Sequence, residues 1–298
     1  MVTVFLRGGL GNQMFQYALG LHLTKKNNAK LVLDTVLLND RFPRKEFAYR
    51  TYGLGVFKLD PEFTLLSRMS AVLPIPGFWL GLDLIFMQLR DKPGLRKIIK
   101  EKNEHAFDSA VLEAKGNVVL WGRWQTEKYF EDIADEVRKA FQLRDELYGE
   151  AALIADEIRR TNSVSIHVRR GDYAAFKSVE QLHGKTDLSY YGRAAADIVA
   201  RISNPHFFVF SDDIAWCRKN LKIRPPATFV AQTAAGPHGA FHLKLMSFCK
   251  HNIITNSTFS WWAAWLNENP RKIVIAPRRW YADNTNQGDI IPERWITK

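Results

Sequence analysis

The chain has 298 residues, 46% of them hydrophobic and 24% charged, a composition that excludes intrinsically disordered, collagen-like and low-complexity proteins. Its 42 Lys and Arg residues outnumber its 31 Asp and Glu residues by 11, which suggests an anionic partner: nucleic acid, a membrane surface or a phosphorylated substrate. Only Cys217 and Cys249 occur as cysteines, so a disulfide framework and a cysteine-based zinc site are excluded, and a reducing, cytoplasmic location is expected.

The first half of the chain begins with a strand–turn–helix–strand pattern, which predicts a parallel sheet covered by helices. The expected elements are a strand at residues 3–7, a glycine-rich turn at 8–11, a helix capped by Asn12, a strand at 30–34, irregular helical sequence at 60–102, a strand at 117–120 and charged helical sequence at 131–160.

The long apolar run at residues 71–89 is interrupted by prolines, glycines and Asp83, which argues against a membrane-spanning helix. Basic residues follow between positions 90 and 102. Two interpretations stay open: a pair of core helices beside a solvated basic face, or a segment that lies on an anionic membrane. The second would place the protein peripherally on the inner face of the cytoplasmic membrane.

The strand–helix alternation restarts at residue 163 and predicts a second α/β unit. Its expected elements are strands at 164–168, 207–210, 228–231, 252–255 and 272–276 and helices at 190–202, 213–221, 241–249 and 259–266. At about 100–200 residues per domain, two domains are expected, at residues 1–155 and 156–298.

Four polar loops follow expected strands, where ligands bind in open parallel sheets. The first, residues 8–13, contains Gly9 and Gly11 and opens a helix whose N–H groups suit an anion. With Asp34 ending the next strand it nearly matches a dinucleotide-binding fingerprint, but Met14 stands where the third glycine is needed. An NAD(P)-dependent oxidoreductase is therefore one alternative function, and a purely structural turn is another interpretation of the loop.

The second loop, residues 167–173, contains two adjacent arginines, Arg169 and Arg170, at the end of a buried strand. Such a pair is unfavourable unless an anion meets it, and guanidinium groups bind phosphate oxygens through two parallel hydrogen bonds. The alternative is a surface ion pair between Arg170 and Asp172.

The third loop places Asp212 and Asp213 after an apolar strand. One carboxylate can cap the next helix, and the other can accept hydrogen bonds from a base such as guanine or bind a metal. The chain contains no Asp-x-Asp element of the kind that metal-dependent sugar transferases usually carry, so a cap with a base contact is favoured over a metal site.

The fourth loop, residues 256–262, places small hydrogen-bonding side chains at a helix start, where they can cap the helix, hold a pyrophosphate or do both. Trp261 and Trp265, four residues apart on that helix, are expected in the core rather than at a sugar.

Together with residues 124–130, these four loops resemble glycosyltransferase family 11, the α-1,2-fucosyltransferases, and most of all its bacterial members that build O-antigen or H-type glycans. The resemblance runs from residue 3 to about 296. It implies a GT-B-like fold with two Rossmann-type α/β domains facing a central cleft, the acceptor on the N-terminal side and GDP-fucose in the C-terminal domain. The implied reaction moves L-fucose, with inversion and without a metal or cofactor, to the 2-OH of a terminal β-galactoside.

The resemblance also assigns residues. Arg169 would grip the β-phosphate and stabilise the departing diphosphate, His167 and Asp212 would approach the guanine, and Asn12 would close over the donor from the first domain. Asp172 is the candidate base, with Glu127 and His183 as alternatives. The residues expected in catalysis are Arg169, Asp172 and Asn12, and those expected to bind the donor are Gly9, Gly11, Gln13, His167, Arg170, Asp212, Asn256, Ser257, Thr258 and Ser260.

The expected partners are thus GDP-fucose and a galactose-terminated oligosaccharide. A nucleic-acid-binding protein is the remaining alternative, suggested by the net charge. Its basic residues should line one face between exposed aromatic side chains. Here basic residues follow strands instead, so no nucleic-acid partner is expected.

Overall fold

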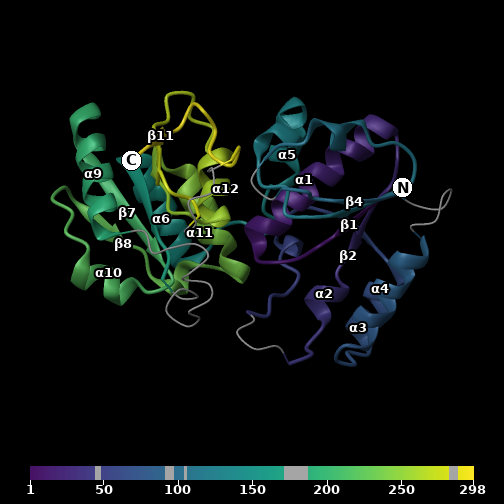
Figure 1. Ribbon diagram of the computed structural model, residues 1–298. Helices are drawn as coiled ribbons and strands as arrows, with labels where there is room; N and C mark the ends of the chain where they lie inside the picture. The colour runs from purple at the N-terminus through teal and green to yellow at the C-terminus, as the bar shows by residue number, and fades with distance from the viewer. Residues whose placement is uncertain (44–47, 91–96, 104–105, 171–186, 282–287) are drawn as a thin grey trace. The chain divides into compact units, whose positions relative to one another are not determined.

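The computed structural model describes residues 1–43, 48–90, 97–103, 106–170, 187–281 and 288–298 (Figure 1). The chain forms two compact α/β units, an N-terminal unit of Met1–Gln142 with Gly288–Ile290 and a C-terminal unit of Leu143–Gln287 with Ile291–Lys298. The division falls earlier than residue 155, because the helix α6 (Gly149–Arg160) packs against α11 (Ala240–Phe248) of the C-terminal unit.

The N-terminal unit contains a five-stranded sheet with the spatial order β3-β2-β1-β5-β4, and all its strand pairings are parallel. The strands are β1 (Val2–Phe5), β2 (Leu31–Asp34), β3 (Glu62–Phe63), β4 (Lys97–Lys100) and β5 (Val118–Trp121). The helices are α1 (Leu10–Asn27), α2 (Val36–Asn39), α3 (Leu65–Val72), α4 (Phe78–Arg90) and α5 (Ala134–Ala140), with 3-10 turns η1 (Leu54–Val56), η2 (Ser109–Glu113), η3 (Glu127–Tyr129) and η4 (Glu131–Ile133).

Helices cover both faces of this sheet. Successive side chains of β1 point to opposite faces, and all four are buried. Val4 faces α1, which packs close to the strand at Gly20, where an added Cβ would lie 2.5 Å from a Val4 methyl group. Phe5 points to the other face and packs with Leu37 of α2 and Leu80 of α4. The result is a three-layer α/β/α sandwich.

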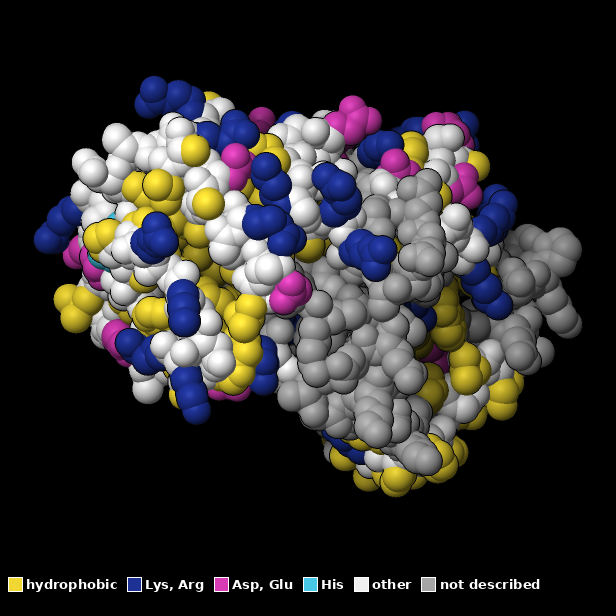
Figure 2. Space-filling view, turned by 60° about the vertical axis from the view of Figure 1, so that its left-hand side comes forward, with side chains coloured by type: hydrophobic (Ala, Val, Ile, Leu, Met, Phe, Trp, Pro, Cys, Tyr) yellow, Lys and Arg dark blue, Asp and Glu magenta, His cyan; other side chains and the backbone are white. Residues whose placement is uncertain are grey.

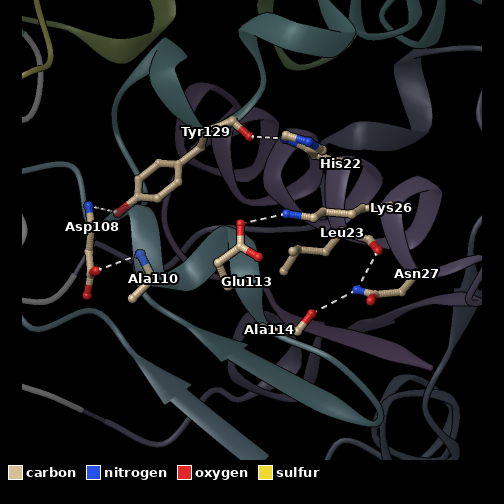
Figure 3. Close-up of polar contacts among 9 residues, drawn as sticks. All are labelled: His22, Leu23, Lys26, Asn27, Asp108, Ala110, Glu113, Ala114 and Tyr129. Carbon is tan, nitrogen blue, oxygen red and sulfur yellow. Dashed lines mark hydrogen bonds and ion pairs between the residues drawn. The ribbon is translucent and has the colours of Figure 1, made fainter.

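Hydrogen bonds and an ion pair connect the second half of α1 to η3 and to the chain around η2 (Figure 3). His22 Nδ1 lies 2.7 Å from the Tyr129 carbonyl oxygen, and the Tyr129 hydroxyl accepts from the Asp108 N–H at 3.1 Å. Lys26 pairs with Glu113 at 2.8 Å, and Asn27 Nδ2 donates to the Ala114 carbonyl at 2.9 Å. Burial raises the pKa of Tyr129 to about 12, so its phenol stays protonated.

The C-terminal unit contains a six-stranded sheet with the spatial order β11-β10-β9-β6-β7-β8, again paired in parallel throughout. The strands are β6 (Asn162–Val168), β7 (Pro205–Ser211), β8 (Ala227–Phe229), β9 (His251–Ile253), β10 (Val274–Ala276) and β11 (Ile296–Thr297). The further helices are α9 (Leu188–Arg201), α10 (Ile214–Asn220) and α12 (Thr258–Leu266), with 3-10 turns η5 (Gln232–Ala234) and η6 (Pro237–Gly239).

This unit is also a three-layer sandwich. Val164 and Ile166 of β6 face α9 and α10, where they pack with Ala194 and Cys217. On the other side, α11 contacts both α6 and α12, and α6 and α11 contact the strands β6 and β7. Trp261 and Trp265 stack with ring centroids 6.4 Å apart and are 0% and 2% exposed, which confirms their predicted place in the core.

The fold expected from the sequence is confirmed in its α/β class and in the order of its main elements. Two local expectations were wrong. Asn12 does not cap α1: the helix starts at Leu10, with Gly9 at the N-cap position. The region 60–102 also contains the strands β3 and β4 besides its helices.

Both cysteines are buried and unpaired. Within the described ranges, none of the helices combines the length and apolar character that crossing a membrane requires.

Candidate functional site

The strand order of the C-terminal unit reverses at one place. From β6 the chain moves outward through β7 and β8, then returns to the other side of β6 and moves outward through β9, β10 and β11. In open α/β sheets, ligands bind outside the carboxyl ends of the strands at such a reversal. The candidate site therefore lies where β6, β7 and β9 end, and three of the four polar loops follow these strands.

Arg169 and Ser257 connect the two sides of the reversal. Arg169 follows β6, Ser257 follows β9, and Arg169 Nη1 donates to Ser257 Oγ at 3.3 Å. Arg169 is half-buried, and Ser257 is the N-cap residue of α12. A cation is thus held beside the N-terminus of a nine-residue helix, and both features favour an anion at this place.

Arg170 is held from three directions at the end of β7. Its backbone N–H donates to Asp212 Oδ1 at 2.8 Å, and its Nε lies 3.4 Å from Asp213 Oδ2. Its guanidinium carbon lies 3.7 Å from the ring centroid of Trp216, a cation–π contact. Asp213 also caps α10, because its Oδ1 accepts from the Trp216 N–H at 3.1 Å, as the sequence predicted for one of the two carboxylates.

His167, near the end of β6, is a buried neutral imidazole. Burial and, secondarily, the charge of nearby Arg169 lower its pKa to about 3. Its ring centroid lies 5.7 Å from that of Phe259 on α12. Among the described residues its Nδ1 is buried without a hydrogen-bond partner, so the ring has a free polar atom for a ligand.

The small polar residues at the start of α12 divide into two groups. Ser260 is fully buried, and its hydroxyl reaches the carbonyl oxygens of Thr255 and Ser257 at 3.4 and 3.2 Å, so it stabilises the helix start. Asn256 is buried and donates to the Trp280 carbonyl at 3.3 Å. Ser257 meets Arg169, and Thr258 is partly exposed at the first helical position. Ser257 and Thr258 are therefore better placed than Ser260 for a ligand.

The glycine-rich loop of the N-terminal unit lies at the end of β1. Gly8 has a φ of +79°, and an added Cβ would lie 2.4 Å from Asn12 Nδ2. Gln13 is fully buried: its amide nitrogen donates to the carbonyls of Gly8 and Thr51, and its oxygen accepts from the Gly53 N–H. Gln13 thus joins two loops, while Gly9 and Gly11 form the start of α1.

The strand order of the N-terminal unit reverses between β1 and β5, and a hydrogen bond spans this reversal as well. Gln125 Nε2 donates to Asn12 Oδ1 at 2.8 Å. The Glu101 carboxylate accepts from the N–H groups of Arg123 and Trp124 at 2.6 and 2.8 Å. These contacts hold Trp124 at a φ of +57°, a conformation that costs energy in a bulky residue.

Asp34 argues against the oxidoreductase alternative. It is 4% exposed, and its two carboxylate oxygens accept from the Val36 N–H at 3.0 Å, the Thr64 hydroxyl at 3.1 Å and the Ser67 hydroxyl at 3.3 Å. It therefore joins β2 to α2 and α3 rather than presenting its carboxylate to a ribose.

Asp172 and His183 lie outside the described residues, so the proposed base stays a prediction.

Sequence reasoning missed Trp216 and Glu101. Trp216 stands three positions after Asp213, in the first turn of an expected helix, and that spacing could have identified it. Glu101 had no such signal. In the part of the chain that the structure covers, no group of three or more His, Cys, Asp or Glu side chains could hold a metal ion.

Comparison with solved structures identifies the fold of this architecture. The chain is similar to the NodZ α-1,6-fucosyltransferase co-crystallized with GDP, with a TM-score of 0.52 and 14% identity, over 92% of this chain and 94% of that one. Two Rossmann-type α/β units in one chain constitute a GT-B-like fold, as expected; the central cleft stays a prediction.

The chain belongs to glycosyl transferase family 11, whose family model matches residues 1–298. It is 32% identical over 298 residues to an Escherichia coli α-1,2-colitosyltransferase, covering 99% of this chain and 98% of the relative. It is 31% identical to the E. coli O-antigen biosynthesis glycosyltransferase WbnK, covering 98% of each. A mouse galactoside 2-α-L-fucosyltransferase, Sec1, is 32% identical over 89% of this chain and 64% of the relative.

Proposed function

We propose that this glycosyltransferase is an inverting galactoside α-1,2-L-fucosyltransferase that moves L-fucose from GDP-β-L-fucose to the 2-hydroxyl of a terminal β-galactoside in an O-antigen or H-type oligosaccharide. The observation that carries the proposal is the hydrogen bond from Arg169 to Ser257, which puts a cation beside the N-terminus of α12 at the strand reversal. Family membership supplies the reaction class.

The chemistry follows from where charge develops. As the bond between the sugar and the diphosphate breaks, the diphosphate gains negative charge and the sugar gains oxocarbenium character. Fixed positive groups at the leaving group stabilise this transition state more than the ground state. Arg169 serves this role directly, and Arg170, held by Asp213 and Trp216, adds a second preorganised cation. No metal or other cofactor is part of this proposal.

Base recognition is assigned to Asp212 and His167. The Asp212 carboxylate is exposed next to the end of β6 and can accept from the N–H groups of guanine. His167 stays neutral because burial lowers its pKa, so it meets the nucleotide as a hydrogen-bonding group and not as a cation. Asp172 is proposed as the base that accepts the proton of the acceptor hydroxyl.

Transfer of colitose is the second candidate, favoured by the relative named as an α-1,2-colitosyltransferase. Colitose is a fucose without the 3-hydroxyl. A site built to bind that hydroxyl rejects the sugar that lacks it, because buried polar groups are then left unpaired.

The proposed location is the cytoplasm, whose reducing conditions suit two unpaired cysteines.

Release of the nucleoside diphosphate, GDP or UDP according to the donor, in the presence of a β-galactoside tests the donor. The purified protein is supplied with GDP-fucose, GDP-colitose, GDP-mannose or UDP-galactose, each with and without EDTA. The proposal expects fastest release from GDP-fucose and no loss with EDTA. Faster release from GDP-colitose would favour the second candidate, and loss of activity on chelation would contradict the metal-free mechanism.

A further inference from the structure

The turn between α3 and α4 exposes six consecutive apolar residues, 71–76. Val72, Leu73 and Ile75 are 87%, 56% and 43% exposed. Of the fifteen large hydrophobic side chains that are exposed in the described residues, nine lie between positions 65 and 86, so they are clustered rather than scattered. Figure 2 shows hydrophobic side chains gathered at the lower edge of the view, at the height of the lower end of α3 in Figure 1. A gathering of this kind marks an interaction surface.

Helix α3 has the reverse of the usual arrangement of polar and apolar faces. Its buried side chains are Ser67 and Ser70, and these accept from the Thr35 N–H at 2.8 Å and from Asn39 Nδ2 at 2.9 Å. Its exposed side chains include Leu65, Met69 and Val72, which lie on one face at spacings of four and three residues. A surface helix normally buries its apolar face and exposes its polar face. The interpretation of the whole 71–89 run as core helices is therefore wrong for its first part.

Every backbone N–H group between residues 73 and 78 donates a hydrogen bond within the protein. Between residues 73 and 78, two positions are prolines, which have no N–H. The other four donate within the protein: Leu73 to Met69, Ile75 to Leu73, Gly77 to the Asp40 carboxylate and Phe78 to Ile75. Trp79 Nε1 also donates to the Leu73 carbonyl at 2.6 Å. Removing this turn from water leaves no backbone donor unsatisfied, a requirement that lipid imposes more strictly than any other environment.

The exposed charges that the structure describes beside the turn, Arg68 and Arg41, are both positive. Arg68 is the only charged residue between positions 64 and 82, and it is exposed on α3. Arg41 is exposed beside Phe42, whose ring would meet a Cβ added at Gly77. Asp40 is buried and accepts from the Gly77 N–H at 2.7 Å. Arginine next to exposed aromatic and aliphatic groups suits the interface of an anionic bilayer.

We propose that the docking turn, residues 71–76 with the exposed face of α3, binds the surface of an anionic lipid bilayer, with its apolar side chains below the headgroups and Arg68 and Arg41 among them. A turn of six residues buries too little area for a stable protein interface, whereas membrane insertion needs only a few apolar side chains and matching charge. The proposal goes beyond the proposed function and does not depend on it.

Vesicle flotation with the full chain tests this docking. The lipids are phosphatidylcholine alone, or phosphatidylcholine with an equal part of phosphatidylglycerol. Wild-type protein is expected to float with the anionic vesicles and not with the neutral ones. The double variant Val72→Ser/Leu73→Ser should bind the anionic vesicles at least about tenfold more weakly, and Arg68→Gln about fivefold more weakly.

Leu153→Ser is the matched control, because Leu153 is 72% exposed on α6 of the C-terminal unit. It should float like wild type, and all variants should keep wild-type turnover on a soluble galactoside. Failure of wild type to bind anionic vesicles, or unchanged binding of the double variant, would overturn the proposal. So would a wild-type dimer that the double variant dissociates, since a second copy would then cover the turn. Vesicle binding is measured without nucleotide, so its result is independent of whether the protein transfers fucose.

Discussion

Arg169 and Ser257 lie 88 positions apart in sequence, yet Arg169 Nη1 donates to Ser257 Oγ at 3.3 Å. The two residues follow strands that are neighbours in the sheet but not in the chain, β6 and β9. The contact therefore depends on the topology of the sheet, and it marks the place where a diphosphate would meet a guanidinium group and a helix N-terminus together.

Replacement of Arg169 by alanine should lower kcat/KM for GDP-fucose by about 10²–10³, because one preorganised partner of the departing diphosphate is lost. The protein should stay folded, with an unchanged melting temperature, since Arg169 is only half-buried. Arg160→Ala is the control, because this side chain is 79% exposed on α6. Near-normal kcat/KM in Arg169→Ala would remove Arg169 from the phosphate site.

Asp212→Asn should weaken the preference for GDP over IDP, whose base lacks the exocyclic amino group. An amide presents a donor where the carboxylate accepts, so the contact to that amino group is lost or reversed. Titration calorimetry should show wild type binding GDP about tenfold more tightly than IDP, and the variant binding both alike. Because the ratio is taken within one protein, partial loss of folding does not affect it. An unchanged ratio would place the guanine elsewhere.

His167 should make the protein less stable in acid. Its pKa is about 3 in the folded protein against 6.5 for an ordinary histidine, so between these values the unfolded chain binds a proton that the folded protein does not. The free energy of unfolding should fall as the pH drops from about 6.5 towards 3, by up to about 1.4 kcal/mol per pH unit from this group. Denaturation of His167→Gln by urea should show a smaller slope, although His242 and His251 act in the same direction. An equal slope in the variant would contradict the assignment.

Gly8→Ala and Gly9→Ala form a matched pair in the N-terminal unit. Gly8 has a positive φ and no room for a Cβ beside Asn12, whereas a Cβ on Gly9 meets nothing within 4 Å. Gly8→Ala should lower the free energy of unfolding by about 1–3 kcal/mol and Gly9→Ala by much less. Equal losses in the two variants would show that the loop is not under the backbone constraint described.

Most of the fold was predictable because its strands are continuous apolar runs. Phe207 to Phe210 in β7 reads as a buried strand from sequence alone. The edge strand β4 was missed because only Ile98 and Ile99 separate its two exposed lysines. A strand with so short an apolar run does not stand out from a helical segment.

The local structure of the site was predictable where a residue's position after a strand decides it, as for Arg169 after β6 and for Asp213, which caps α10. It was not predictable where the role depends on a distant partner. Gln13 was expected to bind the donor, but its amide joins two loops through a carbonyl 38 positions away. Glu101 holds backbone groups 22 and 23 positions away, and no local pattern indicates such a contact.

The linkage and anomeric configuration of the product test the central claim most directly. The protein is incubated with GDP-β-L-fucose and a β-galactoside, and the product is analysed by NMR. We predict one new α-linked L-fucose on the 2-hydroxyl of the galactose, formed about 10²–10³ more slowly when Arg169→Ala replaces wild type. A β-linkage, attachment at another hydroxyl, or the same initial rate of product formation from the variant would contradict it.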